Sequence, residues 1–201
     1  MDIRVSKYLS YLLRHGAEKC NLDINSTGFV SVNQIISLPQ SRNYKLDEKT
    51  IKKIVDTNDK KRFELSRSEN GELLIRACQG HSIRNLDETQ MMMEIIDANE
   101  YPIIVHGTYE KNWDKIKTEG LKTMNRNHVH FAIGYPQDKQ VISGMRKSCE
   151  LFIEIDMHKA IQDGIKFYLS TNKVVLSSGI NNIISPKYFK VVKNRHRQMS
   201  Q

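Results

Sequence analysis

The sequence has few cysteines, and their placement argues against two kinds of small scaffold. Its 201 residues include three cysteines, Cys20, Cys78 and Cys149, which lie far apart and never form a Cys-x-x-Cys pair. An odd, scattered set does not suit a disulfide framework or a zinc ribbon, and it is typical of a reducing compartment. We therefore expect an intracellular protein, cytoplasmic or nuclear.

Long apolar runs are also missing. No stretch approaches the roughly 18 apolar residues that a membrane-spanning helix needs. The N-terminus has neither the apolar core nor the small-residue cleavage site of a secretory signal peptide. We expect no membrane partner.

The common nucleotide and hydrolase motifs are absent as well. The chain contains no Gly-x-Gly-x-x-Gly, no Walker loop and no Gly-x-Ser-x-Gly elbow, so neither a Rossmann site, a P-loop nor an α/β-hydrolase nucleophile is supported. It does carry an excess of positive charge, with a formal net charge of +8 and a pI near 9.3. That excess favours a polyanionic partner without identifying it.

The first helix ends on two residues suited to binding an anion. Val5, Leu9 and Leu12 recur at helical spacing, which predicts a helix near residues 3–14 with one buried stripe. Arg14 and His15 stand side by side at its end, where cations also suit the negative end of the helix dipole. Taken alone, they are typical of a solvated last turn.

Residues 1–84 predict helices followed by a hairpin. Asp47 is an expected N-cap for a second amphipathic helix, with Ile51 and Ile54 on its buried face and lysines on its outer face. The period then changes to alternation near Phe63, and Asn70-Gly71 is a strong hairpin signal. This order of elements is typical of a winged-helix module, a fold that often binds nucleic acid but does not establish function.

The second half predicts a different kind of lobe. Residues 85–100 are polar and Met-rich, and we interpret them as an inter-lobe linker, expected to be helical. Residues 101–201 form the strand-rich lobe, with a helix stopped at Gly120 and strands expected at 103–105, 129–133, 151–155, 165–169, 174–177 and 189–192. The fold class predicted for the whole chain is therefore α+β.

Two kinds of site compete for the polar residues. His128 and His130 lie two apart in an expected strand, so they share a face and with His106 offer metal ligands. Nothing acidic or sulfur-bearing is obviously paired with them, so the metal hypothesis is weak.

The alternative is an anion clamp of four residues, namely Arg14, His15, Arg62 and Arg146. Arginine pairs bidentately with phosphate oxygens, and several forks on one phosphate would stabilise charge during phosphoryl transfer. Spacing alone does not show that the four converge.

Several short pieces carry a resemblance to a known family, and they occur in that family's order over nearly the whole chain. They are residues 6–15 (SKYLSYLLRH), 28–30 (GFV), 61–63 (KRF), 75–82 (IRACQGHS), 106–108 (HGT), 127–132 (NHVHFA), 144–146 (GMR) and 167–172 (FYLSTN). On these residues the chain resembles the tRNA 2′-phosphotransferases, which remove a splice-junction 2′-phosphate using NAD. Gly16, after the Arg-His pair, leaves the local helix geometry open.

The resemblance implies an architecture, a site and a reaction. It implies a winged-helix-like RNA lobe and an ADP-ribosyltransferase-like NAD lobe, with Arg14, His15, Arg62 and Arg146 as the catalytic tetrad. The NAD contacts that we expect with it are His81, Ser82, His106, Gly107, Thr108 and His130, with no metal. The implied products are 2′-hydroxyl RNA, nicotinamide and ADP-ribose 1″,2″-cyclic phosphate, formed through a 2′-phospho-ADP-ribosylated RNA.

The same resemblance implies the partners, and two rival functions stand beside it. The expected partners are NAD and an RNA that carries a 2′-phosphate, bound by a monomer. Two alternatives stay open: an ADP-ribosyltransferase acting on terminal phosphates of nucleic acid, and a non-catalytic RNA-binding module.

Overall fold

The computed structural model describes residues 2–83, 86–87 and 90–195. The chain divides into two compact units, unit 1 (residues 1–91) and unit 2 (residues 92–201). Helices and strands occur in both units, so the α+β class predicted from the sequence is correct.

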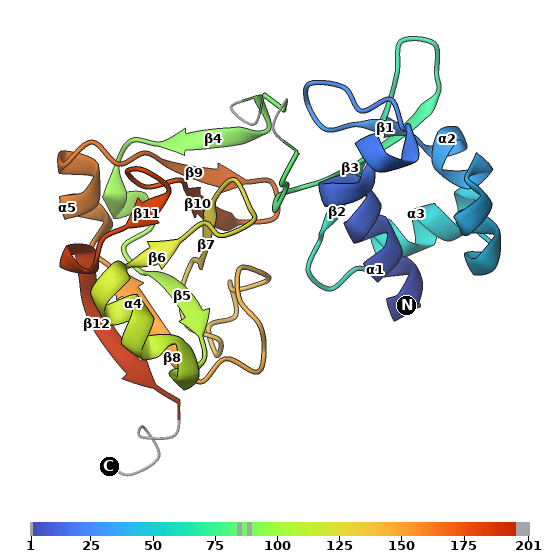
Figure 1. Ribbon diagram of the computed structural model, residues 1–201. Helices are drawn as coiled ribbons and strands as arrows, with labels where there is room; N and C mark the ends of the chain where they lie inside the picture. Colours follow the sequence, from blue (N-terminus) through green and yellow to red (C-terminus); the bar gives the residue numbers. More distant parts are fainter. Residues whose placement is uncertain (1, 84–85, 88–89, 196–201) are drawn as a thin grey trace. The chain divides into compact units, whose positions relative to one another are not determined.

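Unit 1 combines helices with a small antiparallel sheet (Figure 1). Its helices are α1 (Ile3–Tyr11), α2 (Val32–Ser37) and α3 (Glu48–Asp56), and its strands are β1 (Val30–Ser31), β2 (Phe63–Arg67) and β3 (Leu73–Ala77). The sheet order is β1-β3-β2. Each helix begins at a side-chain N-cap, since Asp2, Ser31 and Asp47 accept hydrogen bonds from the amides of Arg4, Gln34 and Thr50, respectively.

The first helix does not continue as predicted. Its α-helical part ends at Tyr11, and Leu12–Gly16 follows as a π-helical turn. Leu12, Leu13 and Gly16 are buried in this turn, while His15 is exposed. Such a turn widens the helix locally and is frequent at functional sites.

The helix predicted after Asp47 and the hairpin predicted around Asn70-Gly71 both lie where expected. Helix α3 presents Ile51 and Ile54 to the core, and β2 pairs with β3 from Phe63↔Ala77 to Arg67↔Leu73. The connecting loop is closed by hydrogen bonds from Ser68 N to Glu72 O and from Gly71 N to Ser68 O, both 2.9 Å. Gly71 has a φ of +79°, a conformation that glycine adopts without strain.

One apolar cluster holds unit 1 together. Leu9, Leu13, Ile35, Ile51 and Ile75 come from α1, the π-helical turn, α2, α3 and β3, and all are fully buried. Because every element contributes to this cluster, the polar residues at the ends of α1 and β3 are held by a packed core.

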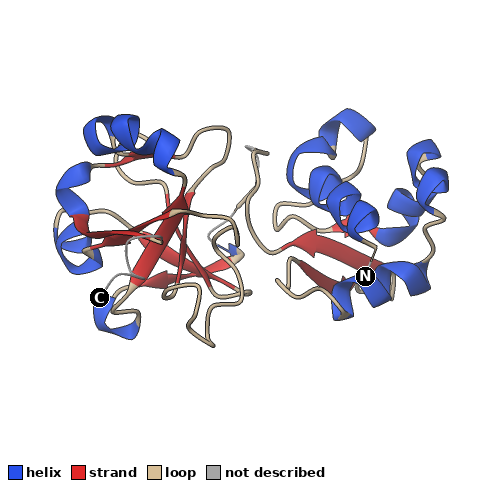
Figure 2. Ribbon diagram, turned by 90° about the horizontal axis from the view of Figure 1, so that it is seen from below, coloured by secondary structure: helices blue, strands red, loops and turns tan. Residues whose placement is uncertain are grey.

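Unit 2 is built around a larger antiparallel sheet in the order β12-β8-β5-β7-β10-β9-β4. Figure 2 shows its crossed strands in the interior of the unit and its helices at the periphery. The strands are β4 (Met92–Ile95), β5 (Ile104–Thr108), β6 (Leu121–Lys122), β7 (Val129–Ala132), β8 (Leu151–Ile155), β9 (Phe167–Ser170), β10 (Val174–Ser177), β11 (Ile183–Ile184) and β12 (Phe189–Asn194), and the helices are α4 (Trp113–Glu119) and α5 (Met157–Gln162). Strands β11 and β6 form a separate pair.

The centre of the large sheet is apolar. Every residue of β7, β8 and β10 is buried, as expected for strands covered on both faces. Phe131 and Phe167 pack with ring centroids 6.2 Å apart, beside the fully buried Ile153. The strands predicted near 103–105, 129–133, 151–155, 165–169, 174–177 and 189–192 are all present, with small shifts at their ends.

The helix expected within residues 85–100 is wrong in its second half. Residues 92–95 form β4, which pairs with β9 from Met92↔Ser170 to Ile95↔Phe167, and residues 85, 88 and 89 lie outside the described residues. Ile95 is buried in the core of unit 2 while Met93 is exposed, so pairing with β9 decides the structure of a segment that has no apolar stripe of its own.

No helix in the described part of the chain is long and apolar enough to cross a bilayer.

Candidate active site

The Arg14-His15 pair is fixed by a segment that leaves the hairpin. Ser82 donates its backbone N–H to the carbonyl of Arg14 at 3.0 Å. The Ser82 hydroxyl and the Nδ1 atom of His15 are 2.9 Å apart and hydrogen-bonded. One serine thus holds both the backbone and the imidazole of the pair, and it orients the ring.

The same segment, residues 78–82, also contacts Arg62. Cys78 N donates to Arg62 O at 2.9 Å, directly after the last pair of the β2–β3 ladder. Gly80, with a φ of +88°, lies against Arg14: a Cβ built there would be 3.5 Å from Arg14 Nε. Segment 78–82 therefore brings three of the four predicted clamp residues to one end of the hairpin.

The Arg62 side chain is held by residues that sequence reasoning did not identify. Asn58 Oδ1 accepts from both the backbone N and the Nη1 of Arg62, each at 3.2 Å. Asp59 Oδ1 lies 3.6 Å from Arg62 Nη1. Asn58 is only 1% exposed, and its Nδ2 donates to Ser6 Oγ on α1 at 3.3 Å.

No signal in the sequence marks Asn58. It follows a helix, where an asparagine is usually a turn residue, and its role depends on contacts with α1 more than fifty residues away along the chain.

Of the two unit 1 residues expected to contact NAD, one is buried and the other is bonded to His15. His81 is 1% exposed, and a Cβ built at Gly28 would lie 3.6 Å from its Nε2 atom. Ser82 is half-buried and bonded to His15. The geometry thus gives Ser82 an orienting position beside the clamp.

In unit 2, the predicted residues gather at the end of β5. His106 Nδ1 and the carbonyl of His130 on β7 are 2.9 Å apart. Because a carbonyl only accepts, Nδ1 carries the proton and Nε2 is left as an acceptor. Thr108 is buried, and its Oγ1 accepts from Asn112 Nδ2 at 3.3 Å.

Two glycines hold the loop that carries Arg146. A Cβ at Gly107 would be 2.8 Å from Cys149 Sγ and 2.9 Å from Met145 Cβ. A Cβ at Gly144 would be 2.8 Å from Ala132 N and Cα, which are fixed strand backbone. The loop therefore packs directly on β5 and β7, and Arg146 projects from it as an exposed side chain.

Positive charge gathers around His106. Burial lowers the pKa of His106, the hydrogen bond to His130 opposes that shift, and the charge of Arg126 adds to it. Burial also lowers the pKa of Arg126, and Arg146 adds to that lowering. Arg146 in turn has a raised pKa because of a hydrogen bond with Tyr109. A neutral imidazole near the guanidinium group of Arg126, which in turn lies near that of Arg146, suits a polar ligand with negative charge.

Arg126 was not identified from the sequence. It lies one residue before the NHVHFA piece, and only its electrostatic coupling to His106 and Arg146 brings it to notice. Of the predicted clamp, Arg14, His15 and Arg62 belong to unit 1 and Arg146 to unit 2.

The histidines predicted as an alternative metal site are used otherwise. His128 packs edge-on against Tyr168, with ring centroids 6.3 Å apart. Within residues 2–83, 86–87 and 90–195, no group of three or more His, Cys, Asp or Glu side chains gathers as a metal ion would require.

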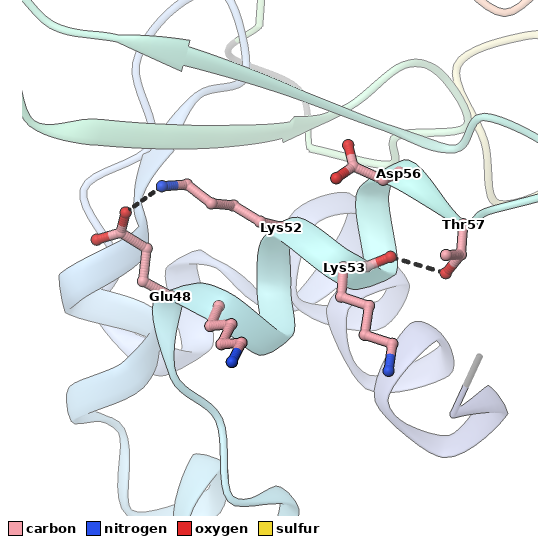
Figure 3. Close-up of a pocket in the computed structure, with 6 residues that line it drawn as sticks. Glu48, Lys52, Lys53, Asp56 and Thr57 are labelled. Carbon is pink, nitrogen blue, oxygen red and sulfur yellow. Dashed lines mark hydrogen bonds and ion pairs between the residues drawn. The ribbon is translucent and has the colours of Figure 1, made fainter.

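A surface hollow of about 590 Å³ lies on α3, and no predicted site residue lines it. Figure 3 shows Glu48, Lys52, Lys53, Asp56 and Thr57 along this face. Lys49 also lines the hollow. Lys52 pairs with Glu48, so the hollow is only partly cationic. The hollow is a feature of the basic outer face of α3, separate from the clamp residues.

The amino-acid sequence is similar to those of known proteins. Residues 1–179 match the family model described as RNA 2′-phosphotransferase, Tpt1 / KptA family. The tRNA 2′-phosphotransferase 1 of Danio rerio is 46% identical over 192 residues, 94% of this chain and 84% of that protein. The tRNA 2′-phosphotransferase 1 of Homo sapiens is 42% identical over 191 residues, 94% of this chain and 74% of that protein.

A third relative extends the comparison to yeast. The tRNA 2′-phosphotransferase of Saccharomyces cerevisiae is 38% identical over 183 residues, covering 89% of this chain and 80% of that protein. The family-model match covers all of unit 1 and most of unit 2, and the four predicted clamp residues lie within its range. The chain belongs to the RNA 2′-phosphotransferase, Tpt1 / KptA family.

Proposed function

We propose that this chain removes an internal 2′-phosphate from RNA, such as a tRNA splice junction, by transferring it to NAD. The observation that carries the proposal is the contact of segment 78–82 with Arg62, Arg14 and His15. Segment 78–82 bonds the backbone carbonyls of Arg62 and Arg14 and the imidazole of His15. Two guanidinium forks and an imidazole on residues anchored in this way would form a suitable receptor for a phosphate dianion.

The two units suit different substrates. We assign unit 1 as a winged-helix RNA lobe, because it carries three helices, a hairpin and the Arg14-His15 pair. We assign unit 2 as an ADP-ribosyltransferase-like lobe that binds NAD without a Rossmann motif. The acceptor Nε2 of His106 suits a ribose hydroxyl, and Arg126 and Arg146 suit the negative charges of a dinucleotide.

The first step is displacement at carbon. A 2′-phosphate oxygen bonds to C1″ of the NAD ribose, the bond to nicotinamide breaks, and nicotinamide leaves with the bonding electron pair as a neutral molecule. The nucleophile is already anionic at neutral pH, so it needs no general base. The role of the clamp here is to hold the phosphate in line.

The second step is displacement at phosphorus. The ribose 2″-hydroxyl bonds to phosphorus, the bond from phosphorus to the RNA 2′-oxygen breaks, and one proton passes from the attacking hydroxyl to the leaving oxygen. Arg14, Arg62 and Arg146 stabilise the charge on the phosphoryl oxygens, and His15, oriented by Ser82, is placed to carry the proton.

The test uses a purified full chain and an RNA with one internal 2′-phosphate. We expect 2′-hydroxyl RNA, nicotinamide and ADP-ribose cyclic phosphate in equal amounts, and only when NAD is present. Resolving both the RNA and the small-molecule products distinguishes the alternatives. An ADP-ribosyl group that stays on a terminal phosphate would indicate the transferase alternative, and binding without any NAD-dependent change would indicate the non-catalytic one.

A further inference from the structure

A strip of three side chains runs along the exposed side of α1 into the π-helical turn. Lys7, Tyr11 and His15 are spaced four residues apart and are all exposed. The rings of Tyr11 and His15 are tilted by 49°, with centroids 6.5 Å apart. The strip thus places an ammonium group, an aromatic ring and an imidazole of the clamp in succession.

Tyr11 is held at this surface by the backbone beneath it. A Cβ built on Gly16 would lie 2.8 Å from Tyr11 Cε1 and 3.2 Å from two further ring atoms. The ring therefore rests over a position where only glycine leaves room for it. It is nevertheless 48% exposed, so it is supported from below and open to the solvent.

We propose that Tyr11 is the stacking platform for the base of the nucleotide whose 2′-phosphate is removed. The inference rests on the proposed function. The base and the 2′-phosphate are attached to neighbouring ribose carbons, C1′ and C2′, so a phosphate at His15 brings its own base to the adjacent ring. Aromatic rings bind unpaired bases through their faces, and they do so with little preference for sequence.

Single exposed apolar residues are common and need no ligand. Ile3 on the same helix is one of these, with 63% exposure. Tyr11 differs from Ile3 in two ways: its ring packs over Gly16, and its neighbour His15 is a clamp residue. The exposed Lys7, one turn before it, is placed to meet a flanking phosphodiester.

The experiment pairs protein variants with altered RNA. Affinity is measured without NAD, by fluorescence anisotropy, for an RNA with one 2′-phosphate and for the same RNA made abasic at that nucleotide. Wild type should lose about 5- to 150-fold in affinity with the abasic RNA, the range for loss of one stacked base. Tyr11→Ala should bind both RNAs equally weakly, because the platform is already gone.

Further variants separate stacking from folding. Tyr11→Phe should retain the affinity, because stacking uses the ring and not the hydroxyl. Gly16→Ala should retain or slightly raise the melting temperature, since alanine favours helix, yet weaken RNA binding by displacing the ring. Ile3→Ala, the matched control, should leave RNA affinity unchanged.

The results separate failure of this inference from failure of the proposed function. If wild type turns over the RNA but Tyr11→Ala and Gly16→Ala bind like wild type, Tyr11 is not the platform. The same conclusion holds if the abasic change costs wild type and Tyr11→Ala the same factor. If wild type itself removes no 2′-phosphate, the proposed function is at fault.

Discussion

Substituting Asn58 with alanine should weaken catalysis although Asn58 lies behind the clamp. The side chain makes two hydrogen bonds to Arg62 at 3.2 Å and one to Ser6 at 3.3 Å. Without them, the guanidinium keeps its ion pair with the exposed Asp59 at 3.6 Å, and such a pair contributes at most about 1 kcal/mol. Arg62 should then sample several rotamers where it now has one.

Two magnitudes follow from these bonds. Two of the distances are at the long end of the normal range and the third is just beyond it, so the loss of the three bonds should lower the free energy of unfolding by about 2–3 kcal/mol. Misplacing a phosphate-binding fork should lower kcat about 10- to 100-fold, toward but not beyond the effect of removing Arg62 itself.

The measurement is kcat and KM on 2′-phosphorylated RNA, well below the melting temperature, together with the melting curve. Ser41→Ala is the matched control, because Ser41 is a buried residue of unit 1 that bonds Tyr8 and the carbonyl of Ile35. It should lose similar stability and keep wild-type kcat.

A conservative variant separates position from packing. Asn58→Asp keeps an acceptor for Arg62 but adds a carboxylate that competes with the substrate phosphate, so the KM for RNA should rise more than kcat falls. If Asn58→Ala is as unstable as the control but has wild-type kcat and KM, Asn58 does not position Arg62.

The remaining predictions concern the clamp, the charge and the metal. Arg62→Ala should slow the second step by roughly a hundredfold and accumulate the 2′-phospho-ADP-ribosylated RNA, because the second step needs charge stabilisation more than the first. Arg62→Lys should restore little activity, and a complete loss of nicotinamide release in Arg62→Ala would assign Arg62 to the first step. RNA affinity should fall steeply between low and moderate salt, and the double variant Lys49→Glu, Lys53→Glu on α3 should show a smaller dependence of affinity on salt. A wild-type affinity that does not change with salt would contradict this prediction. Activity should survive excess EDTA, since arginines meet the phosphate charge; loss on chelation with rescue by zinc or magnesium refutes the clamp mechanism.

The sequence predicts those parts of the fold in which local signals agree. Asp47 supplies a cap, the following apolar spacing supplies a buried face, and Asn70-Gly71 closes a hairpin, so α3, β2 and β3 are found where expected. In unit 2, most strands are apolar runs bounded by turns, and Gly120 ends α4 as predicted.

Two local structures were not predictable from neighbouring residues. Strand β4 takes its conformation from pairing with β9, more than seventy residues away, and its methionines suit a helix equally well. The π-helical turn has the same apolar spacing as an α-helix, so the pattern Leu9, Leu12 and Leu13 does not distinguish them.

In the candidate site too, some residues were predictable from the sequence and others were not. Arg14, His15 and Arg62 were named from residue type and resemblance, and the structure places them along segment 78–82. The residues that hold them were missed. Asn58 and the bond from Ser82 to His15 depend on distant contacts, and a single sequence does not display such contacts.

The π-helical turn at Leu12–Gly16 ends the first helix with more residues per turn than an α-helix has. Removing one residue there would restore a regular α-helix, with better-aligned hydrogen bonds and a more stable N-terminal unit. It would also change the helix turn between Tyr11 and His15, and with it the tilt and spacing of their two rings. The turn is therefore a trade-off between stability and activity, and variants selected only for heat resistance should tend to lose it together with RNA processing.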